Sequence, residues 1–189
     1  TRKLSQVLVR KVINVAGRGL ERQVDELGRT LGEELLEPTR IYTADCLDLM
    51  EAFPVNGEDG QTGSGIRGFS HVTGGGLAAN LARVLPVGTV GLVDRSTWEI
   101  PAIFRLIGEL GGVPQADLER TLNLGVGMIA VVDPSVADAA VARLNDRGLS
   151  SWVLGTVQKD DRSYSSNADY VQGAKGVDGG AAVLLNQYR

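Results

Sequence analysis

The pattern of apolar positions predicts helices in the first third of the chain and an alternation of strands and helices after it. Apolar residues recur at helical spacing in 4–15 and 41–53, and 25–36 is expected to be helical in part. Strands are then expected at 66–72, 88–93, 126–132 and 152–157, with 126–132 buried on both faces. Helices are expected between them at 77–85, 101–110, 115–121 and 134–147. Strands that alternate with helices are typical of a layered α/β domain.

The stretch 66–86 joins the first of these strands to a helix through a glycine-rich turn. The turn consists of Thr73, Gly74, Gly75 and Gly76. Because glycine has no Cβ, the backbone there can adopt positive φ and approach a ligand closely. The helix that follows begins with free N–H groups and the positive end of its dipole. The stretch is either an anion-binding cradle or only a tight connection, and no Walker A Lys-Ser or Lys-Thr pair follows it.

Composition narrows the class of partner. The chain has 189 residues, a formal net charge of −4 and a pI near 5.1, which argues against a nucleic-acid or anionic-membrane surface. No apolar run reaches the length of a membrane span. The single cysteine, Cys46, excludes an internal disulfide and is expected to be a small buried apolar residue of its helix. With His71 as the single histidine, the sequence offers no transition-metal cluster, and the expected location is the cytoplasm.

Several separate motifs resemble those of one enzyme family, AIR synthetase, also called phosphoribosylformylglycinamidine cyclo-ligase. Its C-terminal domain contains runs similar to GFSHVTGGGLAANLARVLP, DRSTWEIPAIFRLIGELGGV and RTLNLGVGMIAVV, in this order. The upstream runs LVRKVI and LGEELLEPTRIY fit the same family. The resemblance covers about residues 8–157 and implies a layered α/β domain with a mixed central sheet flanked by helices. FGAM synthetase, selenophosphate synthetase and thiamine-monophosphate kinase share the fold, but the RVLP and RTLN–GVGM runs favour the cyclo-ligase.

The resemblance implies an ATP-dependent ligase of purine biosynthesis. In that reaction ATP activates the amide oxygen of formylglycinamidine ribonucleotide, and a nitrogen attacks the same carbon to close aminoimidazole ribonucleotide. ATP and Mg²⁺ would be held mainly by an N-terminal domain, which is missing from these residues, and the full-length enzyme would be a homodimer. The family pattern places substrate-phosphate contacts at Arg40 and at Thr73 to Gly76. It places catalytic residues at His71 and Asn123.

Each of these side chains also has a purely structural interpretation. His71 either faces the cleft or points into the core and supports the loop. Arg40 either contacts phosphate or pairs with Glu37. Asn123 either orients an amidine or carbonyl of the substrate or caps the turn before Gly125, since asparagine suits turns.

Both ends of the chain depart from the family pattern. Residues 1–6 read TRKLSQ, where members usually carry a His-Ser-Asn-Gly run. Residues 166–168, Ser-Asn-Ala, resemble the scar of a cleaved affinity tag, and 169–189 resembles the family's N-terminal leader. If so, either the order of the segments differs from that in the gene, or two fragments of a longer chain are numbered consecutively. The alternative is that Ser-Asn-Ala is a coincidence and that an ordinary C-terminal tail follows. We therefore expect a domain at 1–165 that ends in a frayed polar run, 158–165, and a separate leader-like segment that docks on another domain.

Two functions of different classes follow. The first is the substrate-side domain of a cyclo-ligase, active only as part of the full-length enzyme, so that these 189 residues alone should not turn over ATP. The second is a non-catalytic α/β module that binds a phosphorylated small molecule or a partner protein. The mass of the intact gene product distinguishes them, because a mass near that of a two-domain enzyme favours the first.

Overall fold

The N-terminal third is helical, with one short hairpin that the sequence did not indicate. The computed structural model describes residues 6–15, 17, 19–55, 65–174 and 179–189. Its first elements are α1 (Gln6–Val15), β1 (Gln23–Val24), β2 (Arg29–Thr30), α2 (Leu31–Leu35) and α3 (Thr43–Ala52). The expected helix at 25–36 is therefore interrupted by the β1–β2 pair. A capping box between Thr30 and Glu33 explains why α2 begins after that hairpin.

Strands and helices alternate from β3 onward, as predicted. The strands are β3 (Ile66–His71), β4 (Thr89–Asp94), β5 (Met128–Val132), β6 (Gly155–Lys159), β7 (Tyr170–Gln172) and β8 (Ala181–Leu185). The helices are α4 (Gly76–Val84), α5 (Ala102–Gly111), α6 (Gln115–Thr121) and α7 (Ala137–Asp146). No helix in the described part of the chain has the length and apolar character to cross a membrane.

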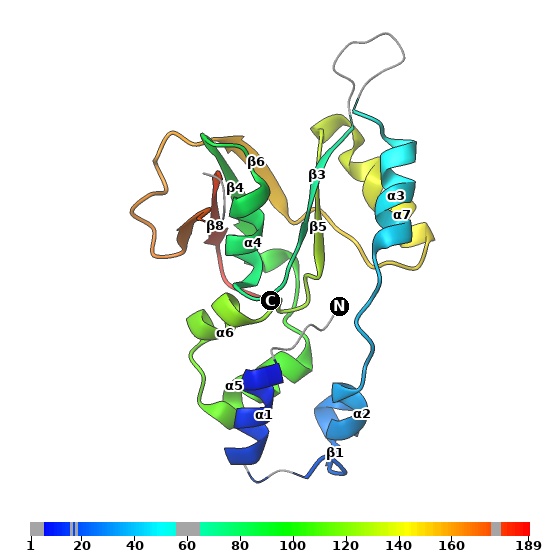
Figure 1. Cartoon of the computed structure of the whole chain (residues 1–189), viewed down its shortest axis with the longest axis vertical. Helices are drawn as coiled ribbons and strands as arrows, with labels where there is room; N and C mark the ends of the chain where they lie inside the picture. Colours follow the sequence, from blue (N-terminus) through cyan, green and yellow to red (C-terminus); the bar gives the residue numbers. More distant parts are fainter. Residues whose placement is uncertain (1–5, 16, 18, 56–64, 175–178) are drawn as a thin grey trace.

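The strands form a mixed sheet and a separate antiparallel pair. The sheet has the order β6-β4-β8-β7, in which β4 is parallel to β8 and antiparallel to β6. Strands β3 and β5 pair with each other, with Phe69 opposite Ala130 and His71 opposite Met128. Figure 1 shows α4 between this pair and the sheet, and α3 with α7 on the other side of the pair. The layered α/β fold with a mixed sheet is thus confirmed.

Two of the apolar clusters in the described residues position the elements around α4 and α5. One joins α1 to α5 and contains Ile103, Phe104 and Ile107, each 0% exposed. The other packs α4 against β4 and β8 through residues such as Leu81, Ala82 and Ala182. Because α4 is buried on this face, the turn at its N-terminus is carried by a rigid element. Strand β5 was expected to be buried on both faces, but it is half-buried along its whole length.

The polar run 158–165 is not a frayed end, and this expectation was wrong. Gln158 and Lys159 belong to β6 and pair with Val90 and Thr89 of β4. The N–H group of Asp160 continues the contact by donating to the carbonyl oxygen of Gly88 at 2.8 Å. Strand β6 is an exposed edge strand, so the main-chain pairing holds it without any apolar signal.

The described residues of the last segment, 169–174 and 179–189, lie inside this domain, where β7 and β8 belong to the mixed sheet. Strand β8 sits between β4 and β7, and Ala181, Ala182 and Val183 are 0% exposed. Residues 166–168 lie in the turn that leads from β6 to β7. The interpretation of 166–168 as a scar and of 169–189 as a leader remains a prediction about the origin of these residues.

Candidate functional site

The glycine turn connects the end of β3 to the first turn of α4. Gly75 and Gly76 have φ of +100° and +73°, so both adopt backbone conformations that residues with a Cβ rarely take. A Cβ at Gly76 would also lie 1.6 Å from the carbonyl oxygen of Glu119 on α6. At Gly74 a Cβ would meet no atom within 4 Å. Helix packing therefore requires glycine at position 76. Gly74 and Gly75 are exposed, and a Cβ at Gly75 would make only ordinary contacts, at 3.6 Å from Ala79 Cβ and 3.8 Å from Asn80 Nδ2.

The side chain of Asn80, which the sequence did not point out, holds this turn in place. Its Nδ2 donates to the carbonyl oxygens of Gly76, Thr73 and Gly74 at 2.7, 3.3 and 3.3 Å. Its Oδ1 accepts from Arg83 Nη2 at 2.5 Å. Asn80 is 1% exposed on the apolar face of α4. A polar residue on that face was the signal available in the sequence.

With the carbonyl groups of the turn held by Asn80, its N–H groups face solvent. In the part of the chain that the structure describes, the N–H groups of Gly74 and Gly75 have no hydrogen-bond partner, and both residues are exposed. They lie at the N-terminus of α4, where the helix dipole favours negative charge. The turn can therefore bind an anion such as a phosphate group.

His71 is exposed at the end of β3, two residues before the turn. The alternation along the strand places its neighbours Ser70 and Val72 in the interior and directs His71 outward. Its ring meets the ring of Tyr42 edge to face, with 6.2 Å between the ring centroids. The alternative in which His71 points into the core does not fit this position.

Asn123 is 1% exposed and lies within a turn. Its Oδ1 accepts from the backbone N–H of Gly125 at 3.4 Å, which is the contact that the turn alternative predicts. Leu124, between them, has a φ of +45°. The catalytic role of Asn123 remains a prediction, and its burial favours an action through the backbone of the turn.

Arg40 is exposed in the segment between α2 and α3. Glu37, its alternative partner, instead accepts from Arg29 Nη2 at 2.9 Å. Arg29 also pairs with the buried Glu34 at 2.6 Å, so α2 and β2 are joined without Arg40. A phosphate contact for Arg40 remains a prediction.

The structure brings most of the predicted site to one end of the β3–β5 pair. The N–H of Val72 donates to the carbonyl oxygen of Gly127 at 3.0 Å, which places the glycine turn beside the turn that contains Asn123. His71 lies opposite Met128 at this end of the pair, and its ring contact with Tyr42 brings in the segment that carries Arg40. In the described residues, no group of three or more His, Cys, Asp or Glu side chains converges on a metal-sized site.

The fold and the site define the class of protein, an α/β domain with a glycine turn between a strand and a helix. Comparison with known proteins defines the family. Residues 5–166 match the family described as AIR synthase related protein, C-terminal domain, and the chain belongs to this family. The resemblance read from the motifs is confirmed.

Three relatives illustrate the match. A protein of Streptomyces fradiae, whose name assigns it provisionally as a phosphoribosylformylglycinamidine cyclo-ligase, is 53% identical over 151 residues, which are 79% of this chain and 77% of that protein. The phosphoribosylformylglycinamidine cyclo-ligase of Anaeromyxobacter sp. (strain Fw109-5) is 47% identical over 74% of this chain, and that of Caldicellulosiruptor bescii is 39% identical over 82%. The chain spans 38% and 42% of these last two proteins.

Proposed function

We propose that this chain is the substrate-side domain of an ATP-dependent phosphoribosylformylglycinamidine cyclo-ligase of purine biosynthesis. The names of its relatives support this activity. The main support for a phosphate site is the pair of N–H groups of Gly74 and Gly75, which have no partner in the described residues. Asn80 fixes the turn that presents them, because it binds the carbonyl oxygen of Gly76. These donors suit the phosphate of a ribonucleotide substrate.

The residues of this chain would bind and orient the substrate. The glycine turn holds the phosphate, and the exposed His71 lies two residues away, where its imidazole can orient an amidine or carbonyl group or carry a proton. Asn123 shapes the adjoining turn. ATP, when bound, supplies the phosphoryl group that converts the amide oxygen into a leaving group. A substrate nitrogen then forms the new C–N bond, the C–O bond to that oxygen breaks, and inorganic phosphate departs.

ATP and Mg²⁺ would be bound mainly by the part of the longer relatives that this chain does not span. We expect the full-length enzyme to be a cytoplasmic homodimer. The 189 residues alone are then expected to show no ATP turnover, because no Walker A lysine follows the glycine turn. ATP-dependent formation of aminoimidazole ribonucleotide by this chain alone would contradict the assignment of the ATP site to another domain.

The experiment that tests the phosphate site is the Gly75→Val change in the full-length enzyme. Valine at φ of +100° strains the backbone and blocks close approach of the phosphate. We expect KM for the ribonucleotide to rise about 10-fold or more, with KM for ATP changed less than about 3-fold, since a lost charged hydrogen bond has this order of effect. Equal effects on both KM values would mean that the turn is only structural.

Gly148→Val is the matched control. Gly148 also has positive φ, at +75°, and a Cβ there would meet no atom within 4 Å. The residue follows α7, away from the glycine turn, so that its replacement introduces similar backbone strain without touching the proposed site. We expect both KM values to remain unchanged in this variant.

A further inference from the structure

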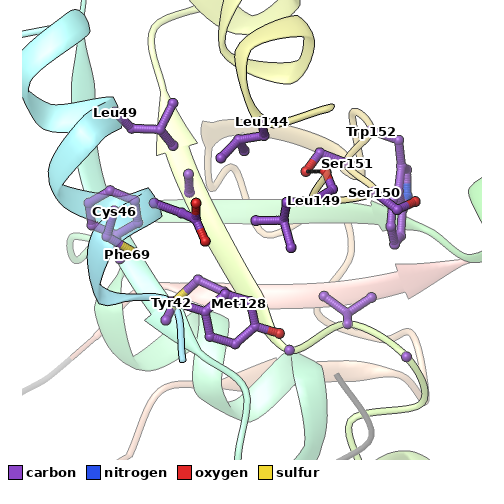
Figure 2. Close-up of a pocket in the computed structure, with 15 residues that line it drawn as sticks. Tyr42, Cys46, Leu49, Phe69, Met128, Leu144, Leu149, Ser150, Ser151 and Trp152 are labelled. Carbon is purple, nitrogen blue, oxygen red and sulfur yellow. Dashed lines mark hydrogen bonds between the residues drawn. The ribbon is translucent and has the colours of Figure 1, made fainter. Parts of the chain in front are cut away.

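A pocket lies beside the predicted site, on the α3 side of the β3–β5 pair (Figure 2). Its volume is about 100 Å³, and its walls come from α3, both strands, the end of α7 and the segment 149–152. Cys46 contributes to one wall and is half-buried, not fully buried as expected. Burial raises the pKa of its thiol, so this side chain is a neutral group at neutral pH.

Tyr42 presents an unpaired hydroxyl group to this pocket. The residue is 8% exposed, yet among the described residues its Oη has no hydrogen-bond partner. Figure 2 shows the ring extending into the space below Leu149, with the hydroxyl group on the side away from α3. Burial raises the pKa of Tyr42 to about 12, so the hydroxyl remains protonated and can both donate and accept.

Asp45, in the first turn of α3, gives the pocket a negative group. Its Oδ1 accepts from Arg147 Nε at 2.9 Å, while Oδ2 has no partner in the described chain. The carboxylate is 19% exposed. Among the described residues, no Lys, Arg or His lines the pocket. The site therefore favours a ligand that donates hydrogen bonds or carries positive charge, and it disfavours an anion.

Most of the remaining walls are apolar and include two aromatic rings, while Ser150 and Ser151 add two polar side chains. Phe69, Met128 and Trp152 line the pocket together with Tyr42 and Asp45. A cavity of about 150 Å³ lined by apolar residues accommodates benzene, so a pocket of about 100 Å³ suits a smaller flat group. Aromatic faces also attract cations.

We propose that this pocket binds a small planar group rich in N–H donors, an amidine or an amino-substituted five-membered ring. Its N–H groups would bond to Asp45 Oδ2 and Tyr42 Oη, and its flat face would lie against the aromatic and thioether side chains. The substrate under the proposed function carries an amidine, and the assignment of that group to this pocket rests on the proposed function. The pocket itself is tested independently with a probe.

The two methionines of the chain allow a direct test. Met128 lines the pocket, whereas Met50 is exposed on α3 and does not. With methyl-¹³C-methionine in the chain, we expect acetamidine to shift the Met128 signal and leave the Met50 signal in place, with a millimolar dissociation constant for so small a ligand. Acetate has the same shape and the opposite charge, and it should shift neither signal. Equal shifts with both probes, or none with acetamidine, would overturn the proposal.

Variants distinguish the named contacts from general attraction. Asp45→Asn should weaken acetamidine binding about 10-fold or more, and Tyr42→Phe about 3- to 10-fold, as expected for a charged and a neutral hydrogen bond. Asp48→Asn is the control, because Asp48 lies on the same helix, pairs with Arg143 at 2.6 Å and does not line the pocket. If Asp45→Asn and Asp48→Asn weakened acetamidine binding equally, the effect would come from the net charge of the protein and not from a contact in the pocket. That result would contradict the proposal. If acetamidine does not bind but Gly75→Val still raises KM for the ribonucleotide, the pocket proposal is wrong and the proposed function is still supported.

Discussion

A Cβ atom at Gly76 would lie 1.6 Å from the carbonyl oxygen of Glu119, so α4 and α6 can meet as they do only while residue 76 is glycine. The Gly76→Ala change must move one helix away from the other, and it also places a Cβ at a φ of +73°. We expect a loss of about 3 kcal/mol or more in the free energy of unfolding, measured by urea denaturation.

Gly74→Ala is the control for this change in the same turn. A Cβ there meets no atom within 4 Å, and the residue has no positive φ. The expected change is within about 1 kcal/mol, in either direction. Similar losses in the two variants would mean that the contact between α4 and α6 is not what requires glycine.

Replacement of Asn80 should loosen the glycine turn. Asn80→Ala leaves the buried carbonyl oxygen of Gly76 without its 2.7 Å hydrogen bond, which is expected to lower the free energy of unfolding by about 1–3 kcal/mol. The amide hydrogens of Gly74 and Gly75 should then exchange in an altered pattern, as measured by NMR. Ser70→Ala is the control, because Ser70 Oγ is buried without a partner in the described structure, and its removal should not destabilise the fold.

The buried Arg95 joins α6 to the C-terminal segment. It donates to both carboxylate oxygens of Glu119 at 2.9 Å, to Asp169 at 2.8 Å and to the carbonyl oxygen of Leu184 at 3.0 Å. Burial acts to lower the pKa of Arg95, and the two carboxylates together raise it above its usual value. Arg95→Met leaves the largely buried carboxylate of Glu119 without its cation and should lower the free energy of unfolding by about 3–5 kcal/mol in urea titrations.

Arg143→Met provides the comparison for an exposed pair. Arg143 bonds to Asp48 at 2.6 Å, but 45% of its side chain is exposed. Solvent screens such a pair, so we expect a loss of no more than about 1 kcal/mol. A loss as large as that of Arg95→Met would show that burial does not determine the strength of these ion pairs.

Asp94 should contribute to the acid sensitivity of the fold. Hydrogen bonds from Asn186, then from the hydroxyl and N–H groups of Ser96, hold the pKa of Asp94 below its usual value. Because the folded pKa is below the unfolded value of about 3.9, the stabilisation is present above that pH and is lost as the pH falls through the folded pKa. Asp94→Asn should therefore show a shallower decline of stability below about pH 4. Parallel curves for the variant and the original chain would exclude this contribution.

The position of β8 predicts that residues 169–189 stabilise this domain. Val183 is 0% exposed between β4 and β7, so Val183→Ala should lower the free energy of unfolding by about 2 kcal/mol. A change below about 0.5 kcal/mol would indicate that the segment belongs against another domain. Leu36→Ala serves as the control, since Leu36 is 81% exposed.

Mass spectrometry tests the origin of the same segment. Trypsin cleaves after Arg162 and Lys175, so a continuous chain yields a peptide of residues 163–175 that spans the Ser-Asn-Ala tripeptide. Two separate polypeptides would instead give a small second mass under denaturing conditions. Recovery of the spanning peptide would exclude two fragments and leave a permuted order or an ordinary C-terminal tail.

The sequence alone was sufficient for the elements whose signal is local. Helix α6 occupies Gln115–Thr121 as predicted, because a proline precedes it and its apolar spacing is complete within a few residues. The strand, glycine turn and helix of 66–86 were also predicted, since their periods of two and 3.6 are visible along the chain. The family followed from motifs in these same segments.

Only the tertiary structure decided the features that depend on distant partners. The polar strand β6 exists because its main chain pairs with β4, and β8 lies in the sheet because Val90 to Asp94 pairs with Ala181 to Leu185 across the length of the domain. The requirement for glycine at position 76 comes from α6, and the turn conformation comes from Asn80. Backbone pairing and close helix contact do not require apolar residues at regular spacing in the segments that make them. The hydrophobic pattern of the sequence therefore could not predict them.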